Sequence, residues 1–222
     1  MTPETEDLVR SATRWAAVPF VPEVTLLTAA EPFGLWDRTA LDAPPFWAFP
    51  WAGGQGLARY ILDHPETVAG RAVLDMASGS GLVAIAAAKA GARSVLAADI
   101  DDNALTAIAL NAAANAVPAV TPGQVDLAAS PAGHAPCAEL AGCAGCADVV
   151  LAADVFYQRD LAALALRFLL AARQRGADAL AADPGRAFVP RESLTALATY
   201  HVPVLTVLED VPVKEVTVYR LR

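Results

Sequence analysis

Cysteine is scarce in this chain of 222 residues, and its three cysteines lie within one short stretch. An odd number of cysteines in close succession gives no disulfide framework. The first residues, MTPETEDLVR, are acidic and lack the apolar core of an export signal. Both absences favour a cytoplasmic protein.

Clusters of lysine and arginine are also absent, as are long apolar runs. The chain carries 16 Lys and Arg against 24 Asp and Glu, for a net charge of −8. Nucleic-acid binding needs a basic face, so no nucleic-acid partner is expected, whereas a protein that presents a lysine suits this charge. No segment reaches the roughly 18 uncharged apolar residues of a membrane span, so no membrane partner is expected either.

What is abundant is apolar residues, which make up 55% of the chain. This content is typical of one globular domain with a substantial core, and nothing demands more than a monomer. Residues 1–45 are rich in proline and indicate an irregular lead-in, although residues 7–17 favour a helix and residues 22–27 a strand. Residues 46–222 then form the main domain.

Residues 72–101 have the pattern of a strand, a glycine turn, a helix and a second strand. The first strand ends at Asp75, the turn supplies Gly79 and Gly81, and the second strand ends at Asp99. Glycines at such a turn let the backbone approach a ligand, and the helix start presents free N–H groups. A carboxylate at the end of the second strand can accept hydrogen bonds from ribose. The pattern predicts a nucleoside-binding βαβ unit.

Two kinds of nucleoside fit this unit. Gly79, Gly81 and Ala84 satisfy the dinucleotide fingerprint, and Asp99 lies near the expected distance beyond it, which would suit a nicotinamide oxidoreductase. Asp75, however, lies at the mouth of the first strand and would repel a pyrophosphate. An anionic side chain there favours a ligand that has a cationic amino-acid end.

Four successive strands are expected to end in aspartate. Because ligands of open α/β sheets bind beyond the carboxyl ends of the strands, these side chains should converge on one crevice: Asp75, Asp99, Asp126 and Asp154. Asp126 is expected to lie in reach of an adenine. The remaining pattern predicts a helix over 158–175, a strand over 179–183, a helix over 191–200 and strands over 202–208 and 213–221. The expected fold is α/β, with a Rossmann-like seven-strand sheet, helices on both faces and a closing antiparallel hairpin.

An aromatic stretch precedes this unit, with Phe46, Trp47, Phe49 and Trp51 in six positions. Core packing is the preferred interpretation for Phe46 and Phe49. Trp51 lies beside a glycine pair and is the better candidate to wall a nucleoside pocket. Gln55 is available there for a polar contact.

A poorly patterned insert over residues 128–147 contains His134, Cys137, Cys143 and Cys146. Three thiolates and one imidazole can hold a structural zinc ion, but the ligand pairs usually lie farther apart. A loop with free thiols and no metal is the favoured interpretation.

Several stretches resemble a known family. DMASGSG from Asp75 resembles the D-x-x-x-G-x-G motif of class I (seven-strand) S-adenosylmethionine (AdoMet) methyltransferases. Together with LAADID, DVFY, ADPGRAFVP and PPFWAFPWAGGQGLARYILDHP, it is similar to the protein-lysine methyltransferases that modify the β subunit of electron transfer flavoprotein. The resemblance covers roughly residues 20–222, from which the cysteine insert departs.

The resemblance implies AdoMet as cofactor and transfer of methyl groups to lysine side chains of a protein, with electron transfer flavoprotein β as the expected substrate. It assigns cofactor binding to Trp51, Gln55, Asp75, Ala77, Ser78, Gly79, Gly81, Asp99, Ile100 and Asp126. A small-molecule N- or O-methyltransferase is the alternative, and an NAD(P)-dependent oxidoreductase a more remote one.

The same resemblance gives catalytic roles to Asp154, which would hold the incoming amine, and to Tyr157, which would orient it. Phe156 would contribute an apolar wall on the substrate side. Asp154 as a cap of the following helix and Tyr157 as plain packing are the competing interpretations. Arg186 could pair with Asp183 or reach an acidic patch of a protein substrate.

Overall fold

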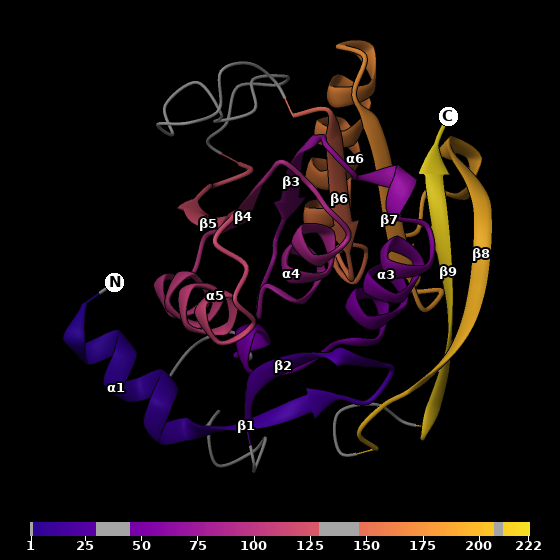
Figure 1. Cartoon of the computed structure of the whole chain (residues 1–222). Coiled ribbons are helices and arrows are strands. Elements are labelled where there is room, and N and C mark those ends of the chain that lie inside the picture. The colour runs from indigo at the N-terminus through magenta and orange to yellow at the C-terminus, as the bar shows by residue number, and fades with distance from the viewer. Residues whose placement is uncertain (1, 30–44, 129–146, 207–210) are drawn as a thin grey trace.

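A mixed seven-stranded sheet forms the centre of the computed structural model, which describes residues 2–29, 45–128, 147–206 and 211–222 (Figure 1). Its strand order is β5-β4-β3-β6-β7-β9-β8. The first five strands pair in parallel, and β9 lies antiparallel between β7 and β8. The strands are β3 (Ala72–Met76), β4 (Ser94–Asp99), β5 (Val120–Gln124), β6 (Val149–Ala153), β7 (Asp178–Asp183), β8 (Leu194–Pro203) and β9 (Val213–Leu221).

Helices cover both faces of this sheet, because successive residues of a strand point to opposite sides. On one face Val73 packs in a cluster with Ile85 of α4, and on the other Leu74 packs in a cluster with Leu169 of α6. The helices are α1 (Pro3–Ala12), α3 (Ala52–Asp63), α4 (Leu82–Lys89), α5 (Asp102–Ala114) and α6 (Arg159–Gln174). The predicted fold class is confirmed, including the closing antiparallel pair.

Glycines allow α3 to lie close to the sheet. A Cβ atom at Gly56 would come within 2.6 Å of Val216 Cγ1 on β9. A Cβ atom at Gly53 would come within 2.8 Å of the carbonyl oxygen of Ala182 on β7. The glycine-rich start of this helix is therefore a packing requirement.

The predicted helix over residues 191–200 is wrong. Only a short 3₁₀ helix, η4 (Arg191–Ser193), occurs there, and β8 begins at Leu194. The strand pairs with β9 along its length, from Leu194 opposite Leu221 to Pro203 opposite Val213. Threonine, tyrosine and valine in this stretch favour strands, and pairing with β9 stabilises the extended form.

The first 29 residues are more regular than the predicted lead-in. Helix α1 ends at Ala12, and residues from Thr13 that were expected to continue it form β1 (Thr13–Val18). This strand pairs with β2 (Val21–Ala29) in a separate antiparallel hairpin, which contains the strand predicted over residues 22–27. The hairpin is tied to α5, because Asn111 Oδ1 accepts a hydrogen bond of 2.9 Å from Leu27 N.

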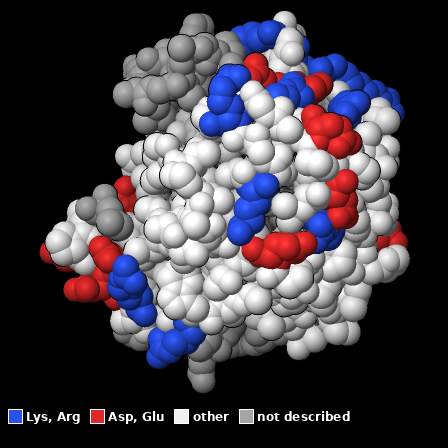
Figure 2. Space-filling model, viewed as in Figure 1, with Lys and Arg blue, Asp and Glu red and all other residues white. Residues whose placement is uncertain are grey.

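Charge is spread thinly over the face shown in Figure 2, where white atoms predominate and blue and red side chains alternate. Within the described part of the chain, no helix has both the length and the apolar character needed to cross a membrane.

Candidate functional site

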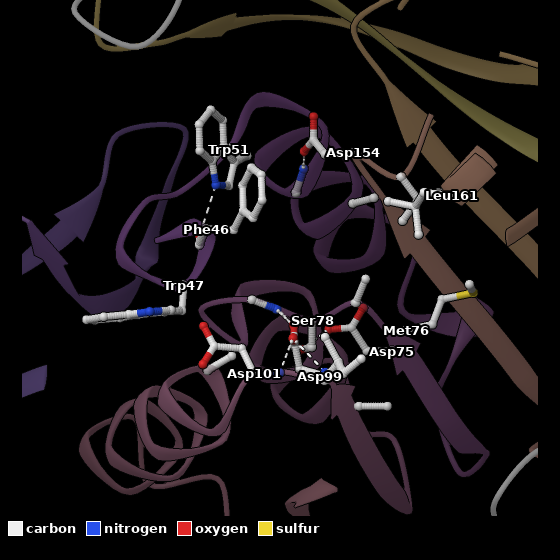
Figure 3. A pocket seen from close by; sticks show the side chains of 18 of the residues that line it. Phe46, Trp47, Trp51, Asp75, Met76, Ser78, Asp99, Asp101, Asp154 and Leu161 are labelled. Atoms are coloured by element: carbon white, nitrogen blue, oxygen red, sulfur yellow. Dashed lines mark hydrogen bonds between the residues drawn. The ribbon is translucent and has the colours of Figure 1, made fainter. Parts of the chain in front are cut away.

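A cavity of about 940 Å³ opens at the carboxyl ends of β3, β4, β5 and β6. Its lining includes the four aspartates that follow or end these strands, Asp75, Asp99, Asp126 and Asp154. The predicted convergence of the four carboxylates on one crevice is confirmed. In Figure 3, Asp75, Asp99 and Ser78 lie on one side of the cavity, whereas Trp51, Phe46 and Asp154 lie on the other.

Two of these carboxylates hold the glycine turn in shape. Asp75 Oδ2 accepts hydrogen bonds from Ser78 Oγ at 2.5 Å and from Ala84 N at 3.1 Å. Asp99 Oδ2 accepts a hydrogen bond of 2.8 Å from Gly79 N. The turn needs this support because its backbone passes through positive φ at Ala77, Gly79 and Gly81, which costs energy at a non-glycine residue.

Asp75 is almost fully buried, and burial raises its pKa to about 7. Its hydrogen bonds from Ser78 and Ala84 oppose this rise, and the nearby charge of Asp99 adds to it. Burial likewise raises the pKa of Asp99, although backbone N–H groups of Gly79, Ile100 and Asp101 donate to that carboxylate. A cation in the cavity would favour the charged form of both acids.

Asp154 connects three elements at the other side of the cavity. It follows β6 with a left-handed φ of 57°, and its Oδ2 accepts a hydrogen bond of 2.8 Å from Gly54 N in the first turn of α3. A Cβ atom at Gly53 would lie 2.6 Å from the same oxygen. The helix that follows Asp154 begins after Gln158, so Asp154 supports α3 and the interpretation as a cap of α6 is wrong.

Aromatic rings form the wall beside Asp154. The Phe46 ring lies 5.4 Å from that of Tyr157 and 5.7 Å from that of Trp51, measured between ring centroids. Trp51 Nε1 donates a hydrogen bond of 2.9 Å to the carbonyl oxygen of Phe46, which fixes the indole in place. Phe46 is only partly buried and lines the cavity, so its preferred assignment to the core is wrong, whereas Phe49 borders the cavity but is buried in a core cluster, as predicted.

Most of the predicted site residues line the cavity: Trp51, Asp75, Ala77, Ser78, Gly79, Asp99, Ile100, Asp126, Asp154 and Tyr157. Burial raises the pKa of Tyr157, so its hydroxyl stays protonated at neutral pH.

Three predicted residues lie elsewhere. Gln55 is buried, and its amide accepts from Phe20 N at 3.1 Å and donates to the Pro50 carbonyl at 2.8 Å, so it holds neighbouring backbone. Gly81 precedes α4 with a φ of 82°, which makes it a turn residue. Phe156 is fully buried in the core cluster that contains α6 residues, and it does not line the cavity, although its neighbours Val155 and Tyr157 do.

Arg186 is a cavity residue whose main partner the sequence did not predict. Its Nη1 atom is hydrogen-bonded to Asp154 Oδ1, and it lines the cavity. The expected pairing with Asp183 is also present, at 3.7 Å between Nη1 and Oδ2. Arg186 follows β7 at the carboxyl edge of the same sheet, and this position in the sequence could have indicated that it lies at the cavity.

Metal ligands are not evident in the part of the chain that the structure describes, which holds no cluster of three or more His, Cys, Asp and Glu. The candidate ligands His134, Cys137, Cys143 and Cys146 lie outside the described residues.

The family model of ribosomal protein L11 methyltransferase (PrmA) matches residues 60–153. The chain is 36% identical over 178 residues to the electron transfer flavoprotein beta subunit lysine methyltransferase of Rattus norvegicus, covering 76% of this chain and 64% of that protein. It is 35% identical over 193 residues to the protein of that name from Danio rerio, covering 82% of this chain and 69% of that protein. The chain thus spans about two thirds of the length of these relatives.

Among solved structures, the fold resembles that of magnesium protoporphyrin IX methyltransferase from Synechocystis PCC 6803 with bound SAH (S-adenosylhomocysteine). The TM-score is 0.51 at 13% sequence identity, over 76% of this chain and 82% of that one. At this identity the likeness concerns the fold alone.

Proposed function

The chain belongs to the electron transfer flavoprotein beta subunit lysine methyltransferase family, within the class I AdoMet methyltransferases, and from this membership we propose that it transfers methyl groups from AdoMet to lysine side chains of electron transfer flavoprotein β. The cavity supports this proposal, because it has a polar, glycine-lined side and an aromatic side that carries a separate carboxylate. That division is the observation on which the proposal depends.

The residues on the polar side fit an adenosyl cofactor. Asp99 ends β4 at the cavity; its Oδ1 accepts hydrogen bonds from two backbone N–H groups, whereas its Oδ2 accepts only that of Gly79 and can accept a ribose hydroxyl as well. Gly79 and Ser78 bring backbone close to the same space, and Asp126 lies beyond β5 in reach of an adenine. When bound, AdoMet would supply a methyl group on a positively charged sulfur.

The residues on the aromatic side suit an amine. A free lysine has a pKa near ~10.4, so the site must favour the neutral form that carries a reactive lone pair. Asp154 attracts and positions the incoming ammonium. The rings of Phe46, Trp51 and Tyr157 disfavour its charged form by excluding water, so the proton is released to bulk solvent before the nitrogen attacks. Alignment of the nitrogen is then the main contribution of the protein.

Replacement of Asp154 tests the assignment. The Asp154→Asn variant keeps an oxygen for Gly54 N but loses the charge, so transfer to electron transfer flavoprotein β should fall about 100-fold or more. Mass spectrometry of the substrate after incubation with AdoMet measures the transfer, and calorimetry with S-adenosylhomocysteine should give an affinity close to that of the wild type.

Three outcomes would contradict the proposal. Full activity of Asp154→Asn would remove Asp154 from catalysis. Methylation of small metabolites in a cell extract, with none on protein, would favour a small-molecule N- or O-methyltransferase. Thermal stabilisation by NAD(P) and none by S-adenosylhomocysteine would favour an oxidoreductase.

A further inference from the structure

Arg186 lies between two carboxylates that end neighbouring strands. Its backbone N–H donates to Asp183 Oδ1 at 2.6 Å, which fixes the turn after β7. Its guanidinium Nη1 is hydrogen-bonded to Asp154 Oδ1 and lies 3.7 Å from Asp183 Oδ2. The Arg186 guanidinium therefore lies closer to the Asp154 carboxylate than to the Asp183 carboxylate.

Asp183 is an acceptor with unused capacity. Its side chain is fully buried, and its Oδ2 atom has no hydrogen-bond partner within the described residues. A separation of 3.7 Å to the guanidinium is too long for a hydrogen bond, and a buried carboxylate oxygen without a donor is energetically unfavourable. A small movement of Arg186 toward Asp183 would therefore satisfy this oxygen.

Both carboxylate oxygens of Asp154, in contrast, already have a hydrogen-bond partner. Gly54 N occupies Oδ2 and the Arg186 guanidinium occupies Oδ1. While Arg186 stays there, it neutralises the charge that would attract a substrate ammonium. A lysine ammonium that enters the cavity therefore meets the full charge of Asp154 only when the guanidinium moves away.

We propose that Arg186 is a movable counter-ion that pairs with Asp154 in the absence of substrate and transfers to Asp183 when the substrate lysine arrives. The exchange replaces one charge-assisted hydrogen bond by another, so the guanidinium is never left unpaired in the half-buried site. Arg186 acts through Asp154 and is a positioning residue. This inference rests on the proposed function, since it takes the incoming group to be a lysine amine.

A crystal structure of the Asp154→Asn variant tests the movement without any substrate. The amide carries no charge, so the guanidinium should shift to Asp183 and come within about 3.2 Å of its Oδ2 atom. A guanidinium that stays on residue 154, or turns to solvent and leaves Asp183 Oδ2 unpaired, would overturn the inference. This result stands even if the protein fails to methylate electron transfer flavoprotein β, a failure that would count against the proposed function.

Steady-state kinetics test the consequence for the substrate. The Asp183→Asn variant keeps the oxygen that accepts from Arg186 N but loses the charge that receives the guanidinium. The KM for the protein substrate should rise about tenfold, with kcat within about twofold of the wild type, because Arg186 stays on Asp154 and competes with the lysine. The double variant Asp183→Asn/Arg186→Gln should recover most of this KM, since the competing cation is gone.

Arg191→Gln is the matched control, because Arg191 is a neighbouring exposed arginine that does not line the cavity. Its KM should equal that of the wild type. A purely structural ion pair predicts the opposite pattern, in which the double variant is impaired at least as much as Asp183→Asn. That pattern, or an unchanged KM in Asp183→Asn, would overturn the inference.

Discussion

Asp75 combines two properties that oppose each other. It is almost fully buried, which favours the protonated acid, and it accepts hydrogen bonds from Ser78 and Ala84, which favour the carboxylate. Burial dominates and raises its pKa to about 7 from an ordinary value of 3.8. The residue that shapes the glycine turn is thus also sensitive to pH near neutrality.

The raised pKa predicts a specific pH dependence of stability. Between about pH 4 and about pH 7 the folded chain holds a proton on Asp75 that the unfolded chain has lost, so the free energy of unfolding falls as the pH rises through this window. The loss should amount to a few kcal/mol, and it should be absent from Asp75→Asn, which has no such proton. Denaturant unfolding of both proteins across this range measures it.

Asp160→Asn is the control for this experiment, because it changes an exposed carboxylate on α6. Its unfolding free energy should follow that of the wild type at every pH. If Asp75→Asn also follows the wild type, the burial of Asp75 does not govern its titration.

The first turn of α3 contacts Asp154 through a pair of glycines, Gly53 and Gly54. The space around these two glycines differs. A Cβ atom at Gly53 would lie 2.6 Å from Asp154 Oδ2 and 2.8 Å from the Ala182 carbonyl oxygen, whereas one at Gly54 would meet only Leu82 Cδ2 at 3.8 Å. Gly53→Ala should therefore displace Asp154, lower kcat and destabilise the fold by about 1–3 kcal/mol. Gly54→Ala should leave kcat near the wild-type value and the stability unchanged or slightly higher.

Methyl-transfer assays and thermal or denaturant unfolding of the two variants provide the comparison. Equal effects of Gly53→Ala and Gly54→Ala would mean that the contact between α3 and Asp154 is not a constraint on the site.

Elements and site residues differ in how far the sequence predicts them. The strands that end at or next to Asp75, Asp99 and Asp154 could be predicted, because each is a buried apolar run with a polar residue near its end. The strand from Leu194 was not predicted, because the local pattern alone also allows a helix and the extended form is stabilised by hydrogen bonds to β9. The Asp154–Arg186 contact spans 32 positions and depends on how β6 and β7 lie side by side.

At the scale of the whole molecule, Asn111 links the amino-terminal hairpin to the glycine turn. Fully buried on α5, it accepts from Leu27 N at 2.9 Å and donates to the Ser80 carbonyl oxygen at 2.8 Å. Asn111→Ala leaves both backbone groups without their partner, so it should destabilise the protein by about 2–4 kcal/mol and weaken binding of S-adenosylhomocysteine. Unfolding experiments and calorimetry measure the two effects.

Asn115→Ala separates these effects. Asn115 also bonds β2, through Thr25 N and the Thr25 carbonyl oxygen, and its amide donates to the Asn111 carbonyl oxygen, but within the described residues it makes no hydrogen bond to the glycine turn. It should destabilise the hairpin and leave the affinity for S-adenosylhomocysteine nearly unchanged. A similar loss of affinity in both variants would show that the hairpin as a whole, not the link to Ser80, supports the cavity.

The most direct measurement is a crystal structure of the protein with S-adenosylhomocysteine. We predict the adenosyl group in the cavity, with its ribose hydroxyls within hydrogen-bond distance of Asp99 and its sulfur facing the side that carries Asp154 and Tyr157. An adenosyl group bound elsewhere, or a sulfur that points away from Asp154, would contradict the account.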